Sequence, residues 1–234
     1  RYGGEHKAKD LQKEAVYGLT ELAREAVKTA RLVANPGCYP TSVQLPLVPL
    51  LEGKMISPDG IVIDAKSGVS GAGRSAKLNL LYTEIAEGIN AYGVGSHRHM
   101  PEIEQGLSDA SGTEVKISFT PHLMPMARGM LSTIYVALQP GFSADDLRTA
   151  LAEKYAGERF VHVLAKGQTP HTRHVRGSNH ALISVHDDRA SGRAIVICAI
   201  DNLMKGASGQ AVQNLNLMMG WDEGLGLGAA AMFP

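Results

Sequence analysis

The order of apolar segments along the chain restricts its fold more than any other feature. From residue 115 onward, segments typical of half-buried or fully buried strands follow one another, with one helical segment, Ser143–Tyr155, among them. The predicted strands are Val115–Phe119, Ser132–Leu138, Phe160–Leu164, Ala181–His186 and Ala194–Ile200. Because strands and helices do not strictly alternate here, we expect an α+β region in the middle of the chain.

At both ends of the chain the pattern is closer to alternation of helices and strands. The predicted early elements are a short helix or lid-like loop at Lys7–Gly18, a helix at Thr20–Ala30, a short buried strand at Arg31–Asn35, an apolar helix through Ser42–Leu51 and a strand at Ile61–Ala65. Pro46 and Pro49 are expected to kink the apolar helix. A helix over Gly206–Met219 precedes a tail. We therefore expect α/β pieces at both ends.

The charge balance excludes two classes of partner. Lys and Arg number 23, as do Asp and Glu, so the formal net charge is zero. Binding to nucleic acid or to an acidic membrane normally requires a basic excess, so we expect neither partner. No apolar run approaches the roughly 18 residues of a membrane span, and a soluble protein is expected.

The two cysteines differ in their surroundings. They are too few for a disulfide framework and form no C-x-x-C pair, so we expect a reducing compartment and no metal site. Cys198 lies in the apolar strand AIVICAI and is expected in the core. Cys38 lies in VANPGCYPT, where a strand, a tight turn and a helix follow one another.

Cys38 is the candidate nucleophile. A helix N-terminus stabilises an anion, so this position is expected to lower the pKa of the thiol and raise its reactivity. The backbone N–H groups of Gly37 and Cys38 are candidate oxyanion donors. The alternative is a buried structural cysteine, as free cysteines usually are.

A base for this thiol is offered by the segment GSHRHMPEIEQ. His97 and His99 point to the same side if the segment is extended. Pro101 is expected to begin a helix at Glu102–Ser108. The spacing of the pair also suits a metal site with Glu102 or Glu104 as the third ligand. A further alternative is that both histidines are solvated surface residues.

Two glycine-rich segments are candidate anion sites. In Ser67–Arg74, small residues allow backbone N–H groups to converge on an anion, and Arg74 adds a bidentate donor. The match to G-x-G-x-x-A at 71–76 lacks the acidic residue that should follow a second strand about 20 positions on, and the match at 224–229 lies too close to the C-terminus to open a βαβ unit. The first segment is therefore a better candidate for substrate phosphate than for a dinucleotide. A third glycine-containing turn, at 201–211, leads into the last helix.

Several stretches, in the same order, carry a family resemblance over nearly the whole chain. They are AVYGLTEL at 15–22, LVANPGCYPT at 32–41, SGVSGAGR at 67–74, GSHRHMPEIEQ at 95–105, FTPHLMPMARGMLSTIYV at 119–136 and DNLMKGASGQAVQNLNLM at 201–218. Together they resemble the N-acetyl-gamma-glutamyl-phosphate reductase family, which is related to aspartate-semialdehyde dehydrogenase.

The resemblance implies an NADPH-dependent reductase of an acyl phosphate, acting in arginine biosynthesis. Cys38 would attack the gamma-carbonyl of N-acetyl-L-glutamyl 5-phosphate, phosphate would leave, and the thioester would accept hydride to give the 5-semialdehyde. His97 or His99 would be the acid/base, with His97 preferred. In the dehydrogenase relative the base follows a segment like LMPMARG, and that position is Met130 here.

The resemblance also implies binding residues and an assembly. Candidate substrate contacts are Ser70, Gly71, Arg74, Arg98, Glu102 and Arg128. Candidate cofactor contacts are Asn35, Gly37, Ser67, Gly68, Asn202, Gly206 and Gly209. A homodimer or homotetramer is expected, in the cytoplasm, or in the plastid stroma if the source is a photosynthetic eukaryote.

The implied fold is α/β plus α+β: the remainder of a Rossmann-type cofactor domain with a larger α+β substrate and dimerisation domain of mixed sheet. Residues 1–38 would be the C-terminal part of a split NADP-binding domain, 39–200 the catalytic and oligomerisation domain, and 201–234 a helix and tail returning to the cofactor domain. The family begins with a nucleotide-binding βαβ segment that precedes Arg1, so we expect these 234 residues alone to bind NADPH poorly.

Three alternatives stay open. The first is the same reaction on an aminoadipyl-type acyl phosphate in lysine biosynthesis, which would differ from the implied reaction only in the shape of the substrate pocket. A Cys/His acyl transferase or hydrolase would need no nicotinamide. A non-catalytic oligomerisation fragment would leave Cys38 unreactive.

Overall fold

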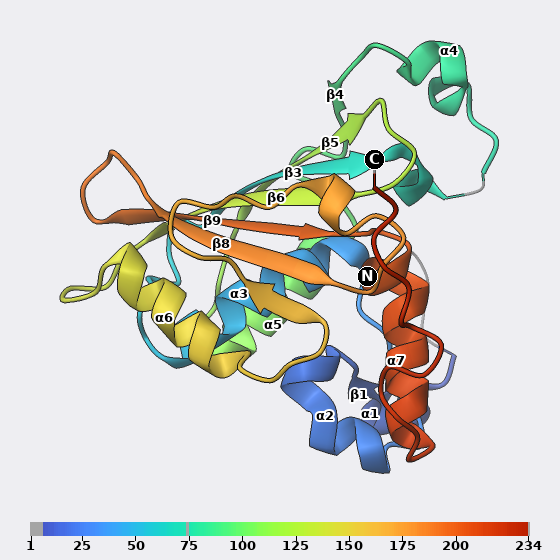
Figure 1. Ribbon diagram of the computed structural model, residues 1–234, viewed down its shortest axis with the longest axis horizontal. Coiled ribbons are helices and arrows are strands. Elements are labelled where there is room, and N and C mark those ends of the chain that lie inside the picture. Colours follow the sequence, from blue (N-terminus) through green and yellow to red (C-terminus); the bar gives the residue numbers. More distant parts are fainter. Residues whose placement is uncertain (1–6, 74, 234) are drawn as a thin grey trace.

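A seven-stranded mixed sheet forms the centre of the protein (Figure 1). The computed structural model describes residues 7–73 and 75–233. The strand order is β4-β5-β3-β6-β9-β8-β7, with β3/β5 and β7/β8 parallel and the other pairs antiparallel. The strands are β3 (Val62–Gly68), β4 (Asn90–Ala91), β5 (Ser118–Met124), β6 (Met130–Ala137), β7 (Val161–Val163), β8 (Ala181–Asp187) and β9 (Arg193–Ile200). The predicted mixed sheet is confirmed.

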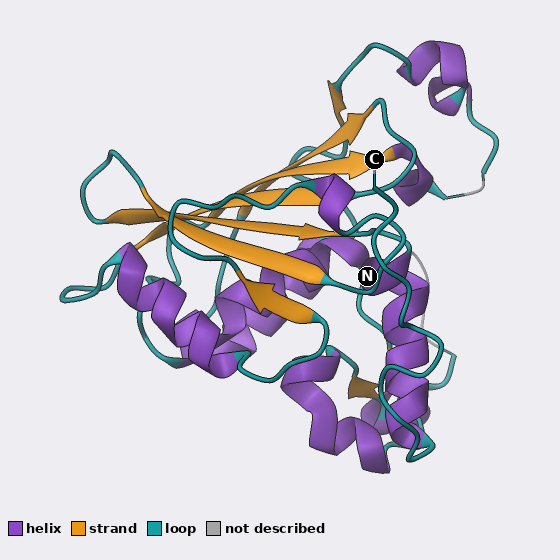
Figure 2. Cartoon of the chain, in the orientation of Figure 1, coloured by secondary structure: helices purple, strands orange, loops and turns teal. Residues whose placement is uncertain are grey.

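Three helices cover one face of this sheet (Figure 2). They are α3 (Cys38–Glu52), α5 (Met100–Ser111) and α6 (Ala144–Lys154). The core lies between these helices and the inward side chains of the strands, which alternate with outward ones, as in β6, where Met130 and Ile134 are buried. At the start of α6, Ser143 and Asp146 form the capping box typical of a helix N-terminus.

The apolar helix α3 continues through both of its prolines. Pro49 has no N–H for the carbonyl of Leu45 four residues earlier, and the Tyr155 hydroxyl donates to that carbonyl instead. Leu45 and Leu50 are fully buried, so packing on nearly all sides of the helix stabilises it. The helix is therefore continuous through both prolines because tertiary contacts stabilise it. A residue with non-helical dihedral angles, Ala23, occurs instead in α2 (Thr20–Thr29).

The N-terminal and C-terminal segments lie together beside the sheet (Figure 1). After α1 (Lys9–Glu14), β1 (Val16–Tyr17) and β2 (Val33–Ala34) form a separate parallel pair. Helix α7 (Gly209–Met218) packs against α2. The buried strand predicted at Arg31–Asn35 is wrong in its burial: Val33 is half-buried and Ala34 exposed, because β2 pairs with β1 outside the main sheet.

The strand predicted at Val115–Phe119 is shifted toward the C-terminus. Val115 is buried without belonging to a strand, and β5 instead continues through Pro121. The Pro121 carbonyl accepts a hydrogen bond from the Tyr92 N–H on the β4 side. The Pro121 nitrogen, which carries no hydrogen, faces the same short edge strand, so no hydrogen bond to β3 is lost.

Short turns and helices complete the chain. They are the 3₁₀ turns Val69–Ala72, Leu78–Leu80 and Thr172–His174, the helix α4 (Tyr82–Ile85) and the π-helix Met204–Ser208. In the part of the chain that the structure describes, no helix combines the length and apolar character needed to cross a membrane.

Candidate active site

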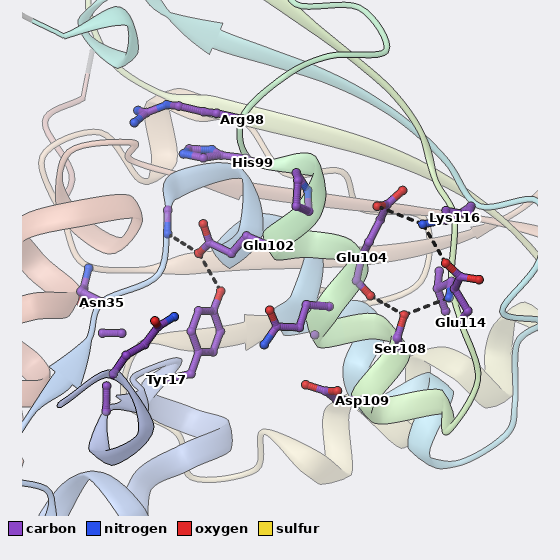
Figure 3. Close-up of a pocket in the computed structure, with 18 residues that line it drawn as sticks. Tyr17, Asn35, Arg98, His99, Glu102, Glu104, Ser108, Asp109, Glu114 and Lys116 are labelled. Atoms are coloured by element: carbon purple, nitrogen blue, oxygen red, sulfur yellow. Dashed lines mark hydrogen bonds and ion pairs between the residues drawn. The ribbon is translucent and has the colours of Figure 1, made fainter. Parts of the chain in front are cut away.

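The turn between β2 and α3 presents Cys38 at the first position of its helix. The Gly37 N–H donates to Oε1 of Glu102 over 2.9 Å, and the Tyr17 hydroxyl donates to the same oxygen over 2.9 Å (Figure 3). Glu102 thus ties β1 and the turn to the first turn of α5. Because the Gly37 N–H is engaged, its predicted role as an oxyanion donor is not supported in this arrangement.

A cleft of about 400 Å³, called the thiol cleft below, opens beside Cys38. Predicted site residues from three separate segments line it: Cys38, Ser67, Gly71, His97, Arg98 and His99. The other polar residues of its wall are not among the site residues that we selected from the sequence, and they are Tyr39, Lys77, Asn79, Asn90 and Tyr92. Tyr39 adjoins the thiol and Tyr92 precedes the histidine motif, so proximity to a motif was the one signal available for them.

The environment of Cys38 changes the expectation for its thiol. Burial raises the pKa of Cys38 to about 11, although the backbone N–H groups of Tyr39 and Cys38 and the Arg98 guanidinium act to lower it. The helix N-terminus therefore does act to lower the pKa of Cys38, as predicted, but burial outweighs it. Removing a thiolate from water costs more free energy than its interaction with these dipoles contributes. The resting residue is a thiol.

The thiol is covered on one side by the π-helix. A Cβ atom added at Gly206 would lie 2.8 Å from Cβ of Cys38, so only glycine allows this approach. Gly206 is buried and does not line the thiol cleft, and its N–H donates to the carbonyl of Asp201, which precedes the π-helix. Its predicted role as a cofactor contact is replaced, in this structure, by packing against the thiol residue.

The raised pKa predicts slow alkylation of Cys38 at neutral pH. The thiolate fraction increases as pH rises through about 11, so the rate with iodoacetamide should climb about tenfold per pH unit between roughly pH 7 and 10. Peptide mass spectrometry measures this rate, with the fully buried Cys198 as the internal control. A plateau below about pH 8.5 would contradict the burial argument.

The histidine pair comes together in a turn, not in an extended segment. The His99 N–H donates to Nδ1 of His97 over 3.1 Å, and the two ring centroids are 5.0 Å apart. A neutral imidazole whose Nδ1 accepts a hydrogen bond carries its proton on Nε2. Burial, with a further contribution from Arg98, lowers the pKa of His97 to about 4. Burial, His97 and Arg98 lower that of His99 to about 3, so both rings are neutral near pH 7.

Aromatic side chains enclose His97. The rings of Tyr39, Tyr92 and Phe119 meet it edge to face, with centroids at 5.3, 5.5 and 5.5 Å. The hydroxyl groups of Tyr39 and Tyr92 are 2.8 Å apart. These contacts fix the orientation of the imidazole at the wall of the thiol cleft.

The alternative interpretations of the histidine pair fit the structure poorly. His99 is 6% exposed and packs on Gly37, where an added Cβ would lie 2.8 Å from the imidazole, so it is no solvated surface group. The two acids considered as metal ligands have other partners: Glu102 accepts from Gly37 and Tyr17, and Glu104 accepts from the Ile117 N–H and faces Lys116.

The first glycine-rich segment is only partly an open loop. Ser67 and Gly68 end β3, and the Gly68 N–H donates to the Gly129 carbonyl over 2.8 Å, which leaves it no donor for a ligand. Gly71 reaches the thiol cleft, whereas Ser70 accepts from Asn202 and does not line it. Arg74, the predicted bidentate donor, lies outside the described residues.

Asp201, which the sequence analysis did not select, organises the loops behind the thiol. It is fully buried and accepts from the N–H groups of Leu203, Met204 and Gly177. Nη2 of Arg128 donates to it over 3.2 Å, so the predicted substrate contact Arg128 is held in an ion pair and lines neither the thiol cleft nor the larger cleft below.

Two predicted cofactor contacts, Asn202 and Gly209, are buried within the protein. The Asn202 amide donates to Ser70 over 3.0 Å and accepts from the Gly129 N–H over 2.8 Å, and it is 2% exposed. Gly209 is buried at the start of α7. Their predicted contacts with a nicotinamide would require a different arrangement of these loops.

A second cleft, of about 980 Å³, adjoins the thiol cleft at Arg98 and His99, which line both (Figure 3). Asn35 and Gly37, two predicted cofactor contacts, line this larger cleft. The Asn35 amide donates to the Ala207 carbonyl over 3.1 Å, which connects the turn before Cys38 to the π-helix. Four carboxylates, those of Glu102, Glu104, Asp109 and Glu114, also line this cleft, together with the cations Arg98 and Lys116. Only its end at Asn35, Gly37 and Arg98 lies beside the catalytic candidates.

A buried ion pair links the π-helix to α2. Nζ of Lys205 lies 2.6 and 2.8 Å from the two carboxylate oxygens of Glu21, and both side chains are inaccessible to solvent. Gln213 of α7 accepts from Lys205 over 2.8 Å and donates to Glu21 over 2.9 Å. Since Gly206 follows Lys205, this pair fixes the segment that packs on Cys38.

Comparison with known proteins supports one family. The model of the semialdehyde dehydrogenase dimerisation domain matches residues 38–202. The N-acetyl-gamma-glutamyl-phosphate reductase of Rhodospirillum rubrum is 63% identical over 233 residues, covering 100% of this chain and 66% of that protein. The probable chloroplastic enzyme of that name from Arabidopsis thaliana is 62% identical, with 100% and 58% covered. The chain therefore spans less than two thirds of either relative.

A solved structure shares the fold. The aspartate semialdehyde dehydrogenase II of Vibrio cholerae superposes with a TM-score of 0.70 at 18% identity, over 88% of this chain and 69% of that one. At this level of identity the comparison concerns the fold alone.

Proposed function

The chain belongs to the semialdehyde dehydrogenase family, among its N-acetyl-gamma-glutamyl-phosphate reductases, and from this membership we propose the activity of the protein that contains it. That activity is the reduction of N-acetyl-L-glutamyl 5-phosphate to N-acetyl-L-glutamate 5-semialdehyde and phosphate, a reaction of arginine biosynthesis. The observation that supports this proposal most directly is the thiol cleft, which Cys38 lines together with two neutral imidazoles and Arg98.

Cys38 is the proposed nucleophile. The thiol loses its proton, its sulfur forms a bond to the acyl carbon, and the bond from that carbon to the phosphate oxygen breaks. A thioester remains, and the departing phosphate takes up the proton. A nicotinamide cofactor, which we propose to be NADPH, supplies the hydride for reduction. The larger cleft, with Asn35 and Gly37 on its wall, is its proposed seat at the thiol end.

Arg98 is proposed to hold the anionic reacting end of the substrate. It lines both clefts, and its charge acts on Cys38 and His97. Because the formal net charge of the chain is zero, attraction for an acyl phosphate depends on such local cations rather than on the overall field.

His97 is the proposed acid/base, and His99 the residue that positions it. The neutral His97 carries its proton on Nε2, which makes it a donor to the oxygen that gains charge when the acyl or aldehyde carbon is attacked. His99 supplies the backbone N–H that fixes this tautomer, while its ring packs on Gly37.

We expect His97→Asn to lower kcat about 10²- to 10⁴-fold in the complete protein, the usual range for loss of an acid/base group. His99→Asn should cost less, since the backbone donor to His97 remains. The acid limb of the wild-type kcat/KM profile should lie near pH 4, because protonation of His97 occurs there as pH falls. Steady-state assays from pH 4 to 9 measure both effects, and equal small losses for the two variants would place the acid/base elsewhere.

A second copy of the chain is the proposed partner. The face of the sheet opposite α3 and α5 carries half-buried apolar residues, among them Leu131, Tyr135 and Ile197, and the matching family model is named for dimerisation. Sedimentation velocity of the complete protein distinguishes a homodimer or homotetramer from a monomer. A cytoplasmic location, or the plastid stroma in a photosynthetic eukaryote, remains a prediction.

Oxidation of the product aldehyde tests the proposed reaction. The complete protein should reduce NADP⁺ with N-acetyl-L-glutamate 5-semialdehyde only when inorganic phosphate is present, because phosphate must release the acyl group from Cys38. Hydrolysis of N-acetyl-L-glutamyl 5-phosphate by water to N-acetyl-L-glutamate and phosphate, at the same rate with and without NADPH, would favour a thiol hydrolase instead.

A further inference from the structure

An arm that projects from the edge of the sheet forms the outer wall of the thiol cleft. We define the arm as residues 77–92, which run from the 3₁₀ turn Leu78–Leu80 through α4 to β4 (Figure 1). Its end is fixed to the sheet, since β4 pairs with β5 and the Tyr92 N–H donates to the Pro121 carbonyl over 3.0 Å. Lys77, Asn79 and Asn90 of the arm line the thiol cleft.

The charges on the cleft wall are all of one sign among the described residues. Lys77 and Arg98 are its cationic side chains, and no carboxylate lines it there. The two cations occupy different positions relative to the thiol. Arg98 stands between His97 and His99, and its charge acts on the thiol of Cys38, whereas Lys77 stands on the arm that forms the outer wall of the cleft.

The polar groups of the arm present a donor set for an anion. Lys77 stands at the start of the 3₁₀ turn, and its carbonyl accepts from the Leu80 N–H over 3.0 Å, which fixes Asn79 and Leu80 beside it. The ammonium of Lys77 and the amides of Asn79 and Asn90 are exposed, and they form no side-chain hydrogen bond or ion pair with another described residue.

We propose that the arm recognises the distal end of the substrate, with Lys77 binding its α-carboxylate and Asn79 and Asn90 contacting its acylated amine. The inference rests on the proposed function, whose substrate carries two anionic groups separated by a short carbon chain. Arg98 in the histidine turn and Lys77 on the arm are cations on two different segments of the cleft wall, and they match the two anionic groups in number. Lys77 is thus a specificity-determining residue, and Cys38 and His97 perform the chemistry.

The test compares two aldehydes in the oxidation direction, with the complete protein, NADP⁺ and phosphate. N-acetyl-L-glutamate 5-semialdehyde has the carboxylate, and 4-acetamidobutanal is the same chain without it. Lys77→Met should lower kcat/KM for the first aldehyde about tenfold or more, chiefly through KM, and change that for the second less than about twofold. Lys77→Arg should recover most of the loss, because the cation remains.

Lys154→Met, which removes an exposed lysine of α6 away from the cleft, is the matched control. If Lys77→Met keeps the wild-type ratio of kcat/KM between the two aldehydes, the inference about the arm is overturned and the proposed function stands. If the wild-type protein oxidises neither aldehyde, the proposed function fails and the inference fails with it.

Discussion

Replacing Cys38 by alanine in the complete protein is expected to lower kcat by at least about 10³-fold in both directions, since the proposed mechanism forms its acyl intermediate on this thiol. Cys38→Ser should be similarly inactive, because a serine hydroxyl in this buried position is a far weaker nucleophile than a thiol. Initial rates of NADPH oxidation and of NADP⁺ reduction measure the losses. Circular dichroism shows whether the variants remain folded.

The other cysteine provides the matched control for this experiment. Cys198 is fully buried in β9, where burial raises its pKa to about 12. Cys198→Ala removes one buried sulfur and should cost about 1 kcal/mol of stability with kcat near the wild-type value. If Cys38→Ala retains wild-type activity, the covalent mechanism is excluded.

Replacing Lys205 by methionine is expected to destabilise the protein by about 3–5 kcal/mol. The substitution keeps the volume of the side chain but leaves the Glu21 carboxylate buried without its cation. Urea unfolding followed by circular dichroism measures the free energy. Lys28→Met is the matched control, because Lys28 forms an exposed pair with Glu25 in the same region and should cost less than about 1 kcal/mol.

The pH dependence identifies the cause of the loss. Burial acts to raise the pKa of Glu21, but Lys205 lowers it below 4.5 overall, so the pair stabilises the wild-type protein above that pH. In Lys205→Met the burial remains without the cation, the pKa of Glu21 rises, and the carboxyl is tolerated only when protonated. The deficit of the variant should therefore shrink as pH falls from 7 to 5.

The double variant Lys205→Met/Glu21→Gln keeps the test decisive if the single variant does not fold. It removes the isolated charge and should recover most of the lost stability. A deficit in Lys205→Met that is the same at pH 5 and pH 7, and that the double variant does not relieve, would rule out an uncompensated carboxylate as its cause.

Local patterns predicted the elements whose stability depends on neighbours in sequence. The capping residue Ser143 marks the start of α6, and alternating apolar residues mark β6 within two residues of its bounds. The prediction was wrong where distant contacts decide the outcome, as at Pro121, which lies inside β5 because its missing donor faces a short edge strand. The continuity of α3 through its prolines also depends on a distant residue, since the Tyr155 hydroxyl donates to the Leu45 carbonyl.

The site was only partly predictable for the same reason. Cys38, His97, Arg98 and His99 meet at the thiol cleft as the motifs indicated. Several predicted contacts are instead bonded within the protein, because a sequence shows that Arg128 can bind an anion but not that Asp201 lies beside it. Lys77, Asn79 and Asn90 carried no motif, and only the return of the arm to the sheet edge brings them to the cleft.

The sequence by itself determined the family, the mixed fold and the presence of one cysteine in a turn and one in a strand. The tertiary structure alone decided the protonation states, because the pKa of a group depends on how much water its surroundings exclude. Burial makes Cys38 a resting thiol and both imidazoles neutral, against the expectation from the helix N-terminus. The tertiary structure also brings together Lys205 and Glu21, which are 184 positions apart and whose pairing no local sequence pattern indicates.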